Sequence, residues 1–421
     1  MNKHLKNKYG FNSFRESQKE IIKDLLDNNN VFCILPTGGG KSLLYQFPAT
    51  FTNKISIVVS PLISLMNDQV INLKIKDIKS CSLNSETNID FNSISKYQII
   101  YTTPEFLSVN INIFDKISDK ICLFAIDEAH CISQWSHDFR PSYKSLSVIK
   151  TKYPNIPLLA VTATATPNVI DEMEKCLNID NVILYLGGTQ RPNLFIEVKA
   201  KEEFTLEYDE PTIIYVQTRK ICNKLHTMFE NNNIKTLKYH GGMNDVEKQN
   251  AHKIFSEGTI NIIIATISFG MGIDKSNIRN VINYGIPTDI ETYYQEIGRA
   301  GRDGLRSSAI LYYDKSDFNF ANYIINTTKN EQQQNRKRLS LNILSKYLSE
   351  HELCRHKMID YYFETGEFCK ESDISTEKCN MCDNCTNTTK NNLQDVTCIA
   401  TKIYNYVNSL NINVGVVKLT N

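Results

Sequence analysis

The chain has 421 residues, too many for one ordinary hydrophobic core, so we expect two or more domains. Its apolar fraction of 41% and charged fraction of 22% are typical of a globular protein, and no stretch approaches the roughly 20 apolar residues of a membrane span. The formal charge of +1 excludes a chain that is basic throughout, so any nucleic-acid surface has to be local.

Residues 1–10 lack the apolar core of a secretion signal, so we expect an intracellular, soluble protein, with nuclear and cytoplasmic locations both open.

The first half of the chain alternates short apolar runs with helical stretches. Continuous apolar runs, typical of strands covered on both faces, lie at residues 31–35, 55–60, 98–101, 121–126 and 158–162. They predict an α/β lobe built on a parallel sheet.

A glycine-rich turn follows the first of these runs and precedes a helix, at residues 35–42. In that context backbone N–H groups converge on phosphate oxygens at a helix N-terminus. Lys41 is then expected to contact the terminal phosphates of ATP, and Ser42 to hold Mg²⁺. Leu35 stands where the usual pattern has its first glycine, and such a turn can also be purely structural. The residues that we expect around the phosphates are Thr37, Gly38, Gly39, Gly40, Lys41 and Ser42.

Two carboxylates, Asp127 and Glu128, end the apolar run at residues 121–126. The carboxyl ends of parallel strands are where open α/β sheets bind ligands. Asp127 is the candidate partner of Mg²⁺, and Glu128 is the candidate for positioning or deprotonating the attacking water. The alternative is a pair of carboxylates that are simply solvated at the end of a strand. The phosphate loop upstream makes this alternative less favoured.

A second series of apolar runs, at residues 212–216, 236–239, 261–265, 281–284 and 308–312, predicts a second α/β lobe. We interpret the polar stretch at residues 199–210 as the linker between the lobes. Near the end of the second lobe, Arg299 and Arg302 are three residues apart and lie on neighbouring positions of a helical turn. An arginine supplied across a cleft stabilises charge on the γ-phosphoryl group, although a surface salt-bridge pair is the favoured interpretation of this segment alone.

Taken in order, these segments resemble the RecQ helicases of superfamily 2 over nearly the whole chain. Asp127–Tyr143 is the most specific segment and is similar to the family's DEAH box and its aromatic-rich loop. Other segments similar to family motifs lie at residues 11–18, 58–69, 101–105, 161–166, 213–219, 265–275 and 295–304. The resemblance implies two RecA-like lobes. It also implies catalytic roles for Gln295, Arg299 and Arg302 together with Lys41, Asp127 and Glu128.

The resemblance also implies contacts with the adenine of ATP. Phe11 is expected to stack on the base, Gln18 to hydrogen-bond its edge, and Arg15 to assist at the nucleotide.

In the aromatic-rich loop, Trp135 and Phe139 can stack on unpaired bases or sense strand occupancy, and base stacking is worth about 1–3 kcal/mol per base. Arg140 can meet a phosphate. Trp135 is the only tryptophan, and packing in the core is the alternative, although its polar neighbours make that a poor place for a core residue.

Five of the 12 cysteines fall between Cys354 and Cys385. Cys354 with Cys379, Cys382 and Cys385 fits a four-thiolate Zn²⁺ site, and RecQ proteins have such a module in this place. Cys369 is the alternative to Cys379. A redox or free-thiol cluster and an iron-sulfur centre are less favoured. A closed thiolate site is structural, since it has no open position for catalysis.

We expect four segments: a RecA-like ATP-binding lobe at 1–200, a second RecA-like lobe at 201–335, a helical zinc-binding module at 336–392, and an incomplete winged helix at 393–421. Because the last resembles only the opening of that domain, strand-stimulated ATP hydrolysis is better supported than robust unwinding. The family implies an ATP-dependent 3′-5′ DNA helicase that uses ATP, Mg²⁺ and Zn²⁺. It would act on single-stranded and forked DNA in recombination and repair. The alternatives are an RNA helicase and a DNA-stimulated ATPase or binding protein without robust unwinding.

Overall fold

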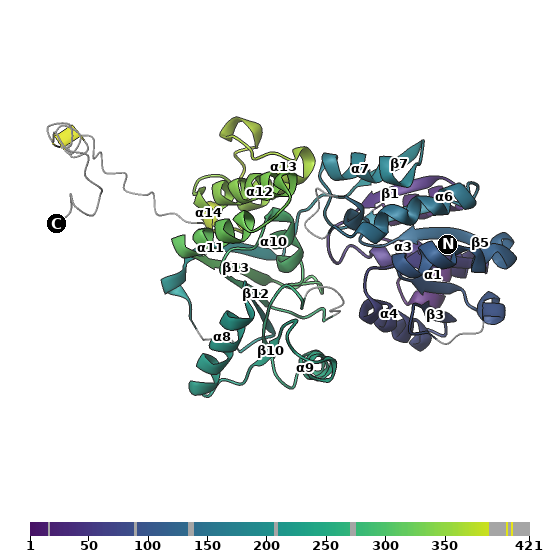
Figure 1. Cartoon of the computed structure of the whole chain (residues 1–421), viewed down its shortest axis with the longest axis horizontal. Helices are drawn as coiled ribbons and strands as arrows, with labels where there is room; N and C mark the ends of the chain where they lie inside the picture. The colour runs from purple at the N-terminus through teal and green to yellow at the C-terminus, as the bar shows by residue number, and fades with distance from the viewer. Residues whose placement is uncertain are drawn as a thin grey trace. The chain divides into compact units, whose positions relative to one another are not determined.

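The computed structural model describes residues 1–15, 17–87, 91–133, 139–205, 209–269, 275–386, 401, 402 and 406. Met1–Cys385 form one compact unit, and the segment from Thr386 onward is assigned to a second. The first unit contains two parallel sheets in tandem, each covered by helices (Figure 1). The expected fold class of two tandem parallel-sheet lobes is confirmed. None of the described helices combines the length and the apolar character needed to cross a bilayer.

The first sheet has seven strands in the order β3-β4-β2-β5-β6-β1-β7. Their bounds are β1 Asn30–Ile34, β2 Ile55–Val59, β3 Ser80–Leu83, β4 Ile99–Thr102, β5 Ile121–Ile126, β6 Leu158–Thr162 and β7 Val182–Leu186. The five inner strands are those that the apolar runs predict. The sequence did not predict β3 and β7, which form the two edges. Strand β3 has two serines among its four residues, whereas β7 was not predicted although its residues are apolar, and both strands are only partly buried.

The helices of the first lobe divide between the two faces of this sheet. Successive strand residues point to opposite faces, so Val31 and Cys33 pack on one side while Phe32 and Ile34 pack on the other. The first face is covered by α1 Asn2–Tyr9, α2 Gln18–Leu26, α3 Lys41–Thr52 and α4 Ile63–Ile75. The second is covered by α5 Pro104–Asn110, α6 Val148–Lys152, α7 Pro167–Leu177 and the 3-10 segments η2 Ile111–Lys120, η3 Ala129–Ile132 and η4 Pro141–Ser147. A further 3-10 segment is η1 Phe91–Lys96.

The second sheet has six strands in the order β10-β11-β9-β12-β13-β8. Their bounds are β8 Leu194–Ala200, β9 Thr212–Val216, β10 Leu237–Tyr239, β11 Ile262–Ala265, β12 Asn280–Tyr284 and β13 Ser307–Tyr313. Strand β8 pairs with β13 along its whole length, from Leu194 opposite Ser307 to Ala200 opposite Tyr313. The chain therefore passes from one sheet to the other between Leu186 and Leu194, earlier than the boundary expected at residue 200. The expected linker, residues 199–210, overlaps the end of this strand.

Helices cover both faces of the second sheet as well. One face carries α8 Arg219–Asn231, and the other carries α9 Asp245–Glu257 and α10 Ile290–Ile297. The chain then continues into α11 Lys315–Asn326, α12 Glu331–Ser349, α13 Arg355–Thr365 and α14 Asp383–Thr386, with 3-10 segments η5 Lys201–Glu203 and η6 Glu371–Asp373. Side chains of α12 and α13 share one apolar cluster with α10, so these helices extend the core of the second lobe (Figure 1).

The C-terminal helices are also joined to strand β8 by buried polar contacts. Arg355 is only 1% exposed and pairs with Asp383 at 2.9 Å. Asp383 accepts a hydrogen bond from the backbone N–H of Val198 at 3.0 Å, and Ile196 N–H donates to the Met381 carbonyl at 3.1 Å. Removing one partner of a buried ion pair costs about 3–5 kcal/mol. Asp383 therefore contributes strongly to the attachment of the C-terminal helices to the sheet.

A buried carboxyl group joins α10 to α13 and makes stability depend on pH. Tyr362 donates a hydrogen bond to Glu291 at 2.5 Å, and burial, with repulsion from Asp289, raises the pKa of Glu291 to about 8 from its ordinary 4.5. The native state therefore keeps a proton that the unfolded chain loses, so stability is expected to fall as pH rises from about 4.5 to about 8.

Glu291→Gln is expected to keep the hydrogen bond from Tyr362 and to make this fall shallower. Measuring Tm between pH 5.5 and 8.5 for both proteins checks the prediction. The dependence does not vanish, because burial also raises the pKa of Glu296 to about 8. Glu364→Gln, at an exposed position of α13, is the control. Equal slopes for Glu291→Gln and the wild type would contradict the prediction.

Candidate nucleotide site and zinc centre

The glycine-rich turn connects β1 directly to α3, which begins at Lys41. Gly38 and Gly40 both adopt a φ of 81°, a conformation that favours glycine. A side chain at Gly40 would also meet Gln18, because its Cβ would lie 2.4 Å from Gln18 Nε2. The turn thus leads to a helix N-terminus with unsatisfied N–H groups, as a phosphate site requires.

Lys41 lies beside the two predicted carboxylates. Its Nζ donates to the carbonyl oxygens of Leu35 at 3.1 Å and Pro36 at 3.4 Å. Burial lowers the pKa of Lys41, and the charges of Glu128 and Asp127 oppose that shift. The structure therefore places the lysine of the turn close enough to the carboxylates at the end of β5 for their charges to interact.

Asp127 and Ser42 share a neighbour that the sequence reasoning missed. The Tyr45 hydroxyl donates to Ser42 Oγ at 3.1 Å and lies 3.4 Å from Asp127 Oδ2. Burial, with repulsion from Glu128, raises the pKa of Asp127 to about 7, which a bound cation would reverse. A hydroxyl and a carboxylate are oxygen ligands of the kind Mg²⁺ prefers, so the two side chains fit that ion. The signal for Tyr45 was its position one helical turn after Ser42.

Glu128 begins the turn after β5 in a left-handed conformation, with a φ of 49°. Its Oε2 lies 3.3 Å from His130 Nδ1, and the same nitrogen lies 2.7 Å from Thr162 Oγ1 at the end of β6. The two neighbouring strand ends are thus linked by polar contacts next to the carboxylates.

The arginine-bearing turn of the second lobe lies against the phosphate loop of the first. Gly298 is so close that a Cβ there would be 2.8 Å from Thr37 Oγ1, and Arg302 Cγ lies 3.6 Å from the Cβ position of Gly38. Arg302 also adds to the positive potential at Lys41. Arg299 is buried beside Tyr215. Burial raises the pKa of the Tyr215 hydroxyl to about 12, and the positive charges of Arg299 and, less strongly, Arg302 oppose that rise.

Gln295 precedes this turn and also contacts the first lobe. Its Nε2 lies 3.0 Å from Thr164 Oγ1 and 3.4 Å from His130 Nε2. Of the three residues predicted from the second lobe, Gln295 and Arg302 therefore contact the first lobe, while Arg299 is buried beside Tyr215 of its own sheet.

The N-terminal residues expected at adenine lie against the phosphate loop. Arg15 Nη1 hydrogen-bonds the Gly38 carbonyl, and Gln18 Nε2 donates to the carbonyls of Gly39 at 3.3 Å and Gly40 at 3.2 Å. Gln18 Oε1 accepts from Arg15 N–H, so both ends of the amide are used within the protein. Phe11 is 50% exposed, as a ring that stacks on a base needs to be. Their roles at the base stay predictions.

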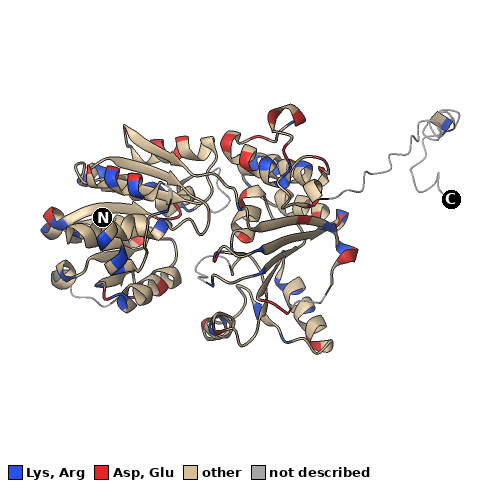
Figure 2. Cartoon of the chain, turned by 180° about the vertical axis from the view of Figure 1, so that it is seen from behind, with Lys and Arg blue, Asp and Glu red and all other residues tan. Residues whose placement is uncertain are grey.

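The residues expected at the nucleic acid are only partly described. Trp135 lies outside the described residues, as do 270–274 and most of the expected winged-helix segment. Phe139 lines a cavity of about 620 Å³ whose other lining residues lie between Tyr215 and Leu341. Lys144 Nζ lies 5.2 Å from the centre of the Phe139 ring. Arg140 Nη1 donates to the Pro61 carbonyl at 2.8 Å. Lys and Arg positions are interspersed with Asp and Glu positions along the described chain (Figure 2).

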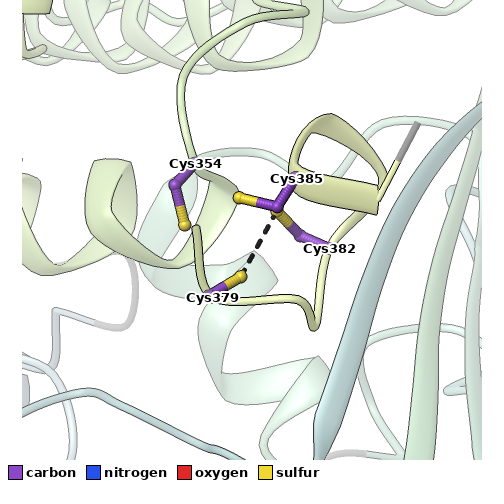
Figure 3. A group of neighbouring side chains, drawn as sticks. All are labelled: Cys354, Cys379, Cys382 and Cys385. Carbon is purple, nitrogen blue, oxygen red and sulfur yellow. Dashed lines mark hydrogen bonds between the residues drawn. The ribbon is translucent and has the colours of Figure 1, made fainter. Parts of the chain in front are cut away.

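The C-terminal helices bring four cysteine thiols together. Cys354, Cys379, Cys382 and Cys385 have all their sulfur atoms within 4.8 Å of one another, and the thiols face a common centre (Figure 3). The sulfurs of Cys379 and Cys382 are 3.6 Å apart. A tetrahedral zinc with Zn–S bonds of about 2.3 Å spaces its sulfurs about 3.8 Å apart, so the cluster fits that ion. Cys369 is buried in the same apolar cluster, but its thiol is not part of this group.

Three family models match consecutive parts of the chain. "DEAD/DEAH box helicase" matches residues 15–173, "Helicase conserved C-terminal domain" matches 197–304, and "RecQ zinc-binding" matches 315–386, which include the four cysteines. "Putative ATP-dependent DNA helicase Q1" of Caenorhabditis briggsae is 35% identical over 433 residues, which cover 96% of this chain and 69% of the relative. The chain belongs to the RecQ helicase family.

Other relatives of this RecQ chain differ in length and in name. The "Bifunctional 3'-5' exonuclease/ATP-dependent helicase WRN" of Mus musculus is 39% identical over 90% of the chain, which spans only 29% of that relative. The "Putative ATP-dependent RNA helicase R290" of Acanthamoeba polyphaga mimivirus is 37% identical over 93% of the chain and 73% of the relative.

A solved structure shows the same fold. Dbp5 of S. cerevisiae, bound to RNA and ADP BeF3, matches with a TM-score of 0.62 at 21% identity, over 83% of this chain and 98% of that one. The expected cofactors, ATP with Mg²⁺ and Zn²⁺, agree with the helicase and RecQ zinc-binding models and with the cysteine cluster.

Proposed function

We propose that this RecQ chain hydrolyses ATP to move 3′-5′ along single-stranded DNA and to separate duplex strands, in recombination and repair. The observation that carries the proposal is the contact of the turn at residues 298–302 with the phosphate loop. It assembles residues of both lobes around one nucleotide site, which is the arrangement that a motor coupling hydrolysis to lobe movement needs.

Each group has a defined role in this proposal. Ser42 and Asp127 would hold Mg²⁺, and Lys41 would contact the β- and γ-phosphates. Glu128 would position or deprotonate the attacking water, while Arg302 would stabilise the charge that develops on the γ-phosphoryl group. Cys354, Cys379, Cys382 and Cys385 would hold Zn²⁺ in a closed structural site. Bound Mg²⁺ supplies the positive charge that neutralises the phosphate oxygens.

DNA is the proposed substrate, since two of the three relatives described above are named as DNA helicase or as an exonuclease with helicase activity. The mimivirus relative, named as an RNA helicase, keeps RNA as the second candidate. The domain organisation proposed from the sequence is retained, with the second lobe beginning at β8 rather than at residue 201.

The proposal is tested by measuring ATP hydrolysis by the zinc-loaded chain alone, with single-stranded DNA, and with single-stranded RNA. We expect strong stimulation by DNA and at least about a 100-fold loss of turnover in Lys41→Ala, because the loss of one charge contact at a reacting phosphoryl group has effects of that size. Equal stimulation by RNA would favour the RNA helicase. No hydrolysis with any strand would refute the motor, and a fork-unwinding assay separates a helicase from an ATPase that does not unwind.

A further inference from the structure

A buried arginine from the connection between the two sheets reaches the nucleotide site. Arg191 lies between β7 and β8 and is 8% exposed. Its guanidinium donates to the carbonyls of Gly298 at 3.2 Å, Ala300 at 2.5 Å and Gly301 at 3.2 Å. It also reaches the Thr37 carbonyl of the phosphate loop at 3.4 Å. One side chain therefore contacts both lobes at the place where they meet.

The chemistry of these partners explains why arginine is suited to this position. All four are neutral carbonyl oxygens, and burial lowers the pKa of Arg191. A buried charge is costly unless its hydrogen bonds are made, and the planar guanidinium can donate in several fixed directions at once. A lysine at this position would keep the charge but lose that geometry.

The same connecting segment holds the turn at a second point. Asn193 Nδ2 donates to the carbonyls of Gly301 and Leu305, both at 2.9 Å. The bond to Thr37 is the longest of the four made by Arg191. The other three bonds go to the turn of the second lobe.

We propose that Arg191 is a positioning residue, which fixes the turn that carries Arg299 and Arg302 against the phosphate loop. This inference rests on the proposed ATP hydrolysis and deepens it. Arg191 touches the backbone of the turn and of the loop, so it acts through Arg302. A misplacement of about 1 Å can cost about 100-fold in rate, so the turn has to be held closely.

The test compares wild type, Arg191→Gln and Arg191→Lys in the zinc-loaded full chain. It measures kcat and KM for ATP with saturating single-stranded DNA, and the affinities for ADP and for ADP with beryllium fluoride, a mimic of the γ-phosphoryl group. We expect kcat and the affinity for the mimic to fall about 10- to 100-fold in both variants. KM and the affinity for ADP should stay within about threefold, because Lys41 and the loop are intact.

Arg279→Gln is the matched control. Arg279 pairs with Asp303 of the same turn at 2.7 and 2.6 Å, and its other bonds go to the carbonyls of Asn277 and Arg306. Its removal should change kcat less than about threefold. A double variant, Arg191→Gln with Arg302→Ala, should be no slower than Arg302→Ala alone, since residues that act as a unit are not additive.

Three results would overturn the proposal: wild-type kcat in both Arg191 variants, an equal fall of kcat in Arg279→Gln, or a fall of kcat accompanied by an equally large rise of KM and by falls in ADP affinity and Tm. If the wild-type chain binds nucleotide but hydrolyses no ATP, the proposed function fails and the inference is judged by binding alone. In that case, an unchanged ratio of mimic affinity to ADP affinity in Arg191→Gln overturns it. A wild-type chain that binds no nucleotide overturns both the proposed function and the inference.

Discussion

Arg302→Ala is expected to lower kcat for ATP hydrolysis by about 10³- to 10⁵-fold, the range found for arginines that stabilise a transferring γ-phosphoryl group. Arg302 has this role in our proposal because it lies against Gly38 and contributes to the potential at Lys41. KM for ATP should change by only a few-fold, since the charge it stabilises develops in the transition state. Steady-state hydrolysis with saturating single-stranded DNA measures both constants.

Two further variants make this prediction specific. Arg299→Ala should have the smaller effect on kcat, because Arg299 is buried beside Tyr215 of its own sheet. Arg306→Ala, at an exposed position just after the turn, should be close to wild type. A larger loss in Arg299→Ala than in Arg302→Ala would reverse the roles of the two arginines.

Loss of the zinc site is expected to unfold the C-terminal module and to destabilise the second lobe with it. Structural zinc contributes about 10–16 kcal/mol in zinc-finger peptides, so the loss of one thiolate is a large change. In this chain Met381 and Asp383, which lie next to the cysteine ligands, are bonded to strand β8. Cys382→Ser is therefore expected to lower both zinc content and Tm, and a strong chelator should do the same to the wild-type protein.

Zinc content also separates the two cysteine sets that the sequence left open. Cys379→Ser should lose zinc, while Cys369→Ser should keep one zinc per chain, because Cys369 is outside the thiol cluster. Retention of zinc by Cys379→Ser together with its loss from Cys369→Ser would show that the alternative set is the correct one.

Features governed by local pattern were predictable from the sequence. The inner strands are continuous apolar runs, and the phosphate loop and the carboxylates after β5 follow from their places at strand ends. The edge strand β8 was not predicted, although its residues from Ile196 to Lys199 alternate between apolar and charged, as in a half-buried strand.

Contacts between residues far apart in the chain could not be predicted from the sequence either. Tyr45 is near Asp127, 82 positions away, and Arg191 bonds to carbonyls more than 100 positions away in the chain. Such partners are set by the way the sheets and their connection pack, and no local motif carries them. The preference for Cys379 over Cys369, by contrast, was already a prediction from the sequence, and the four thiols that lie together include Cys379.

Strand β8 lies at the edge of the second sheet, and the segment with the clustered cysteines contacts it, with Ile196 bridged to Cys382 and Val198 bonded to Asp383. An uncovered edge strand offers unpaired N–H and C=O groups to other chains and promotes aggregation. We therefore expect this segment to protect the edge of the second sheet from pairing with other chains. A fragment ending after β13 would expose this edge, so poor solubility of such a fragment would reflect a missing cover and not a misfolded sheet.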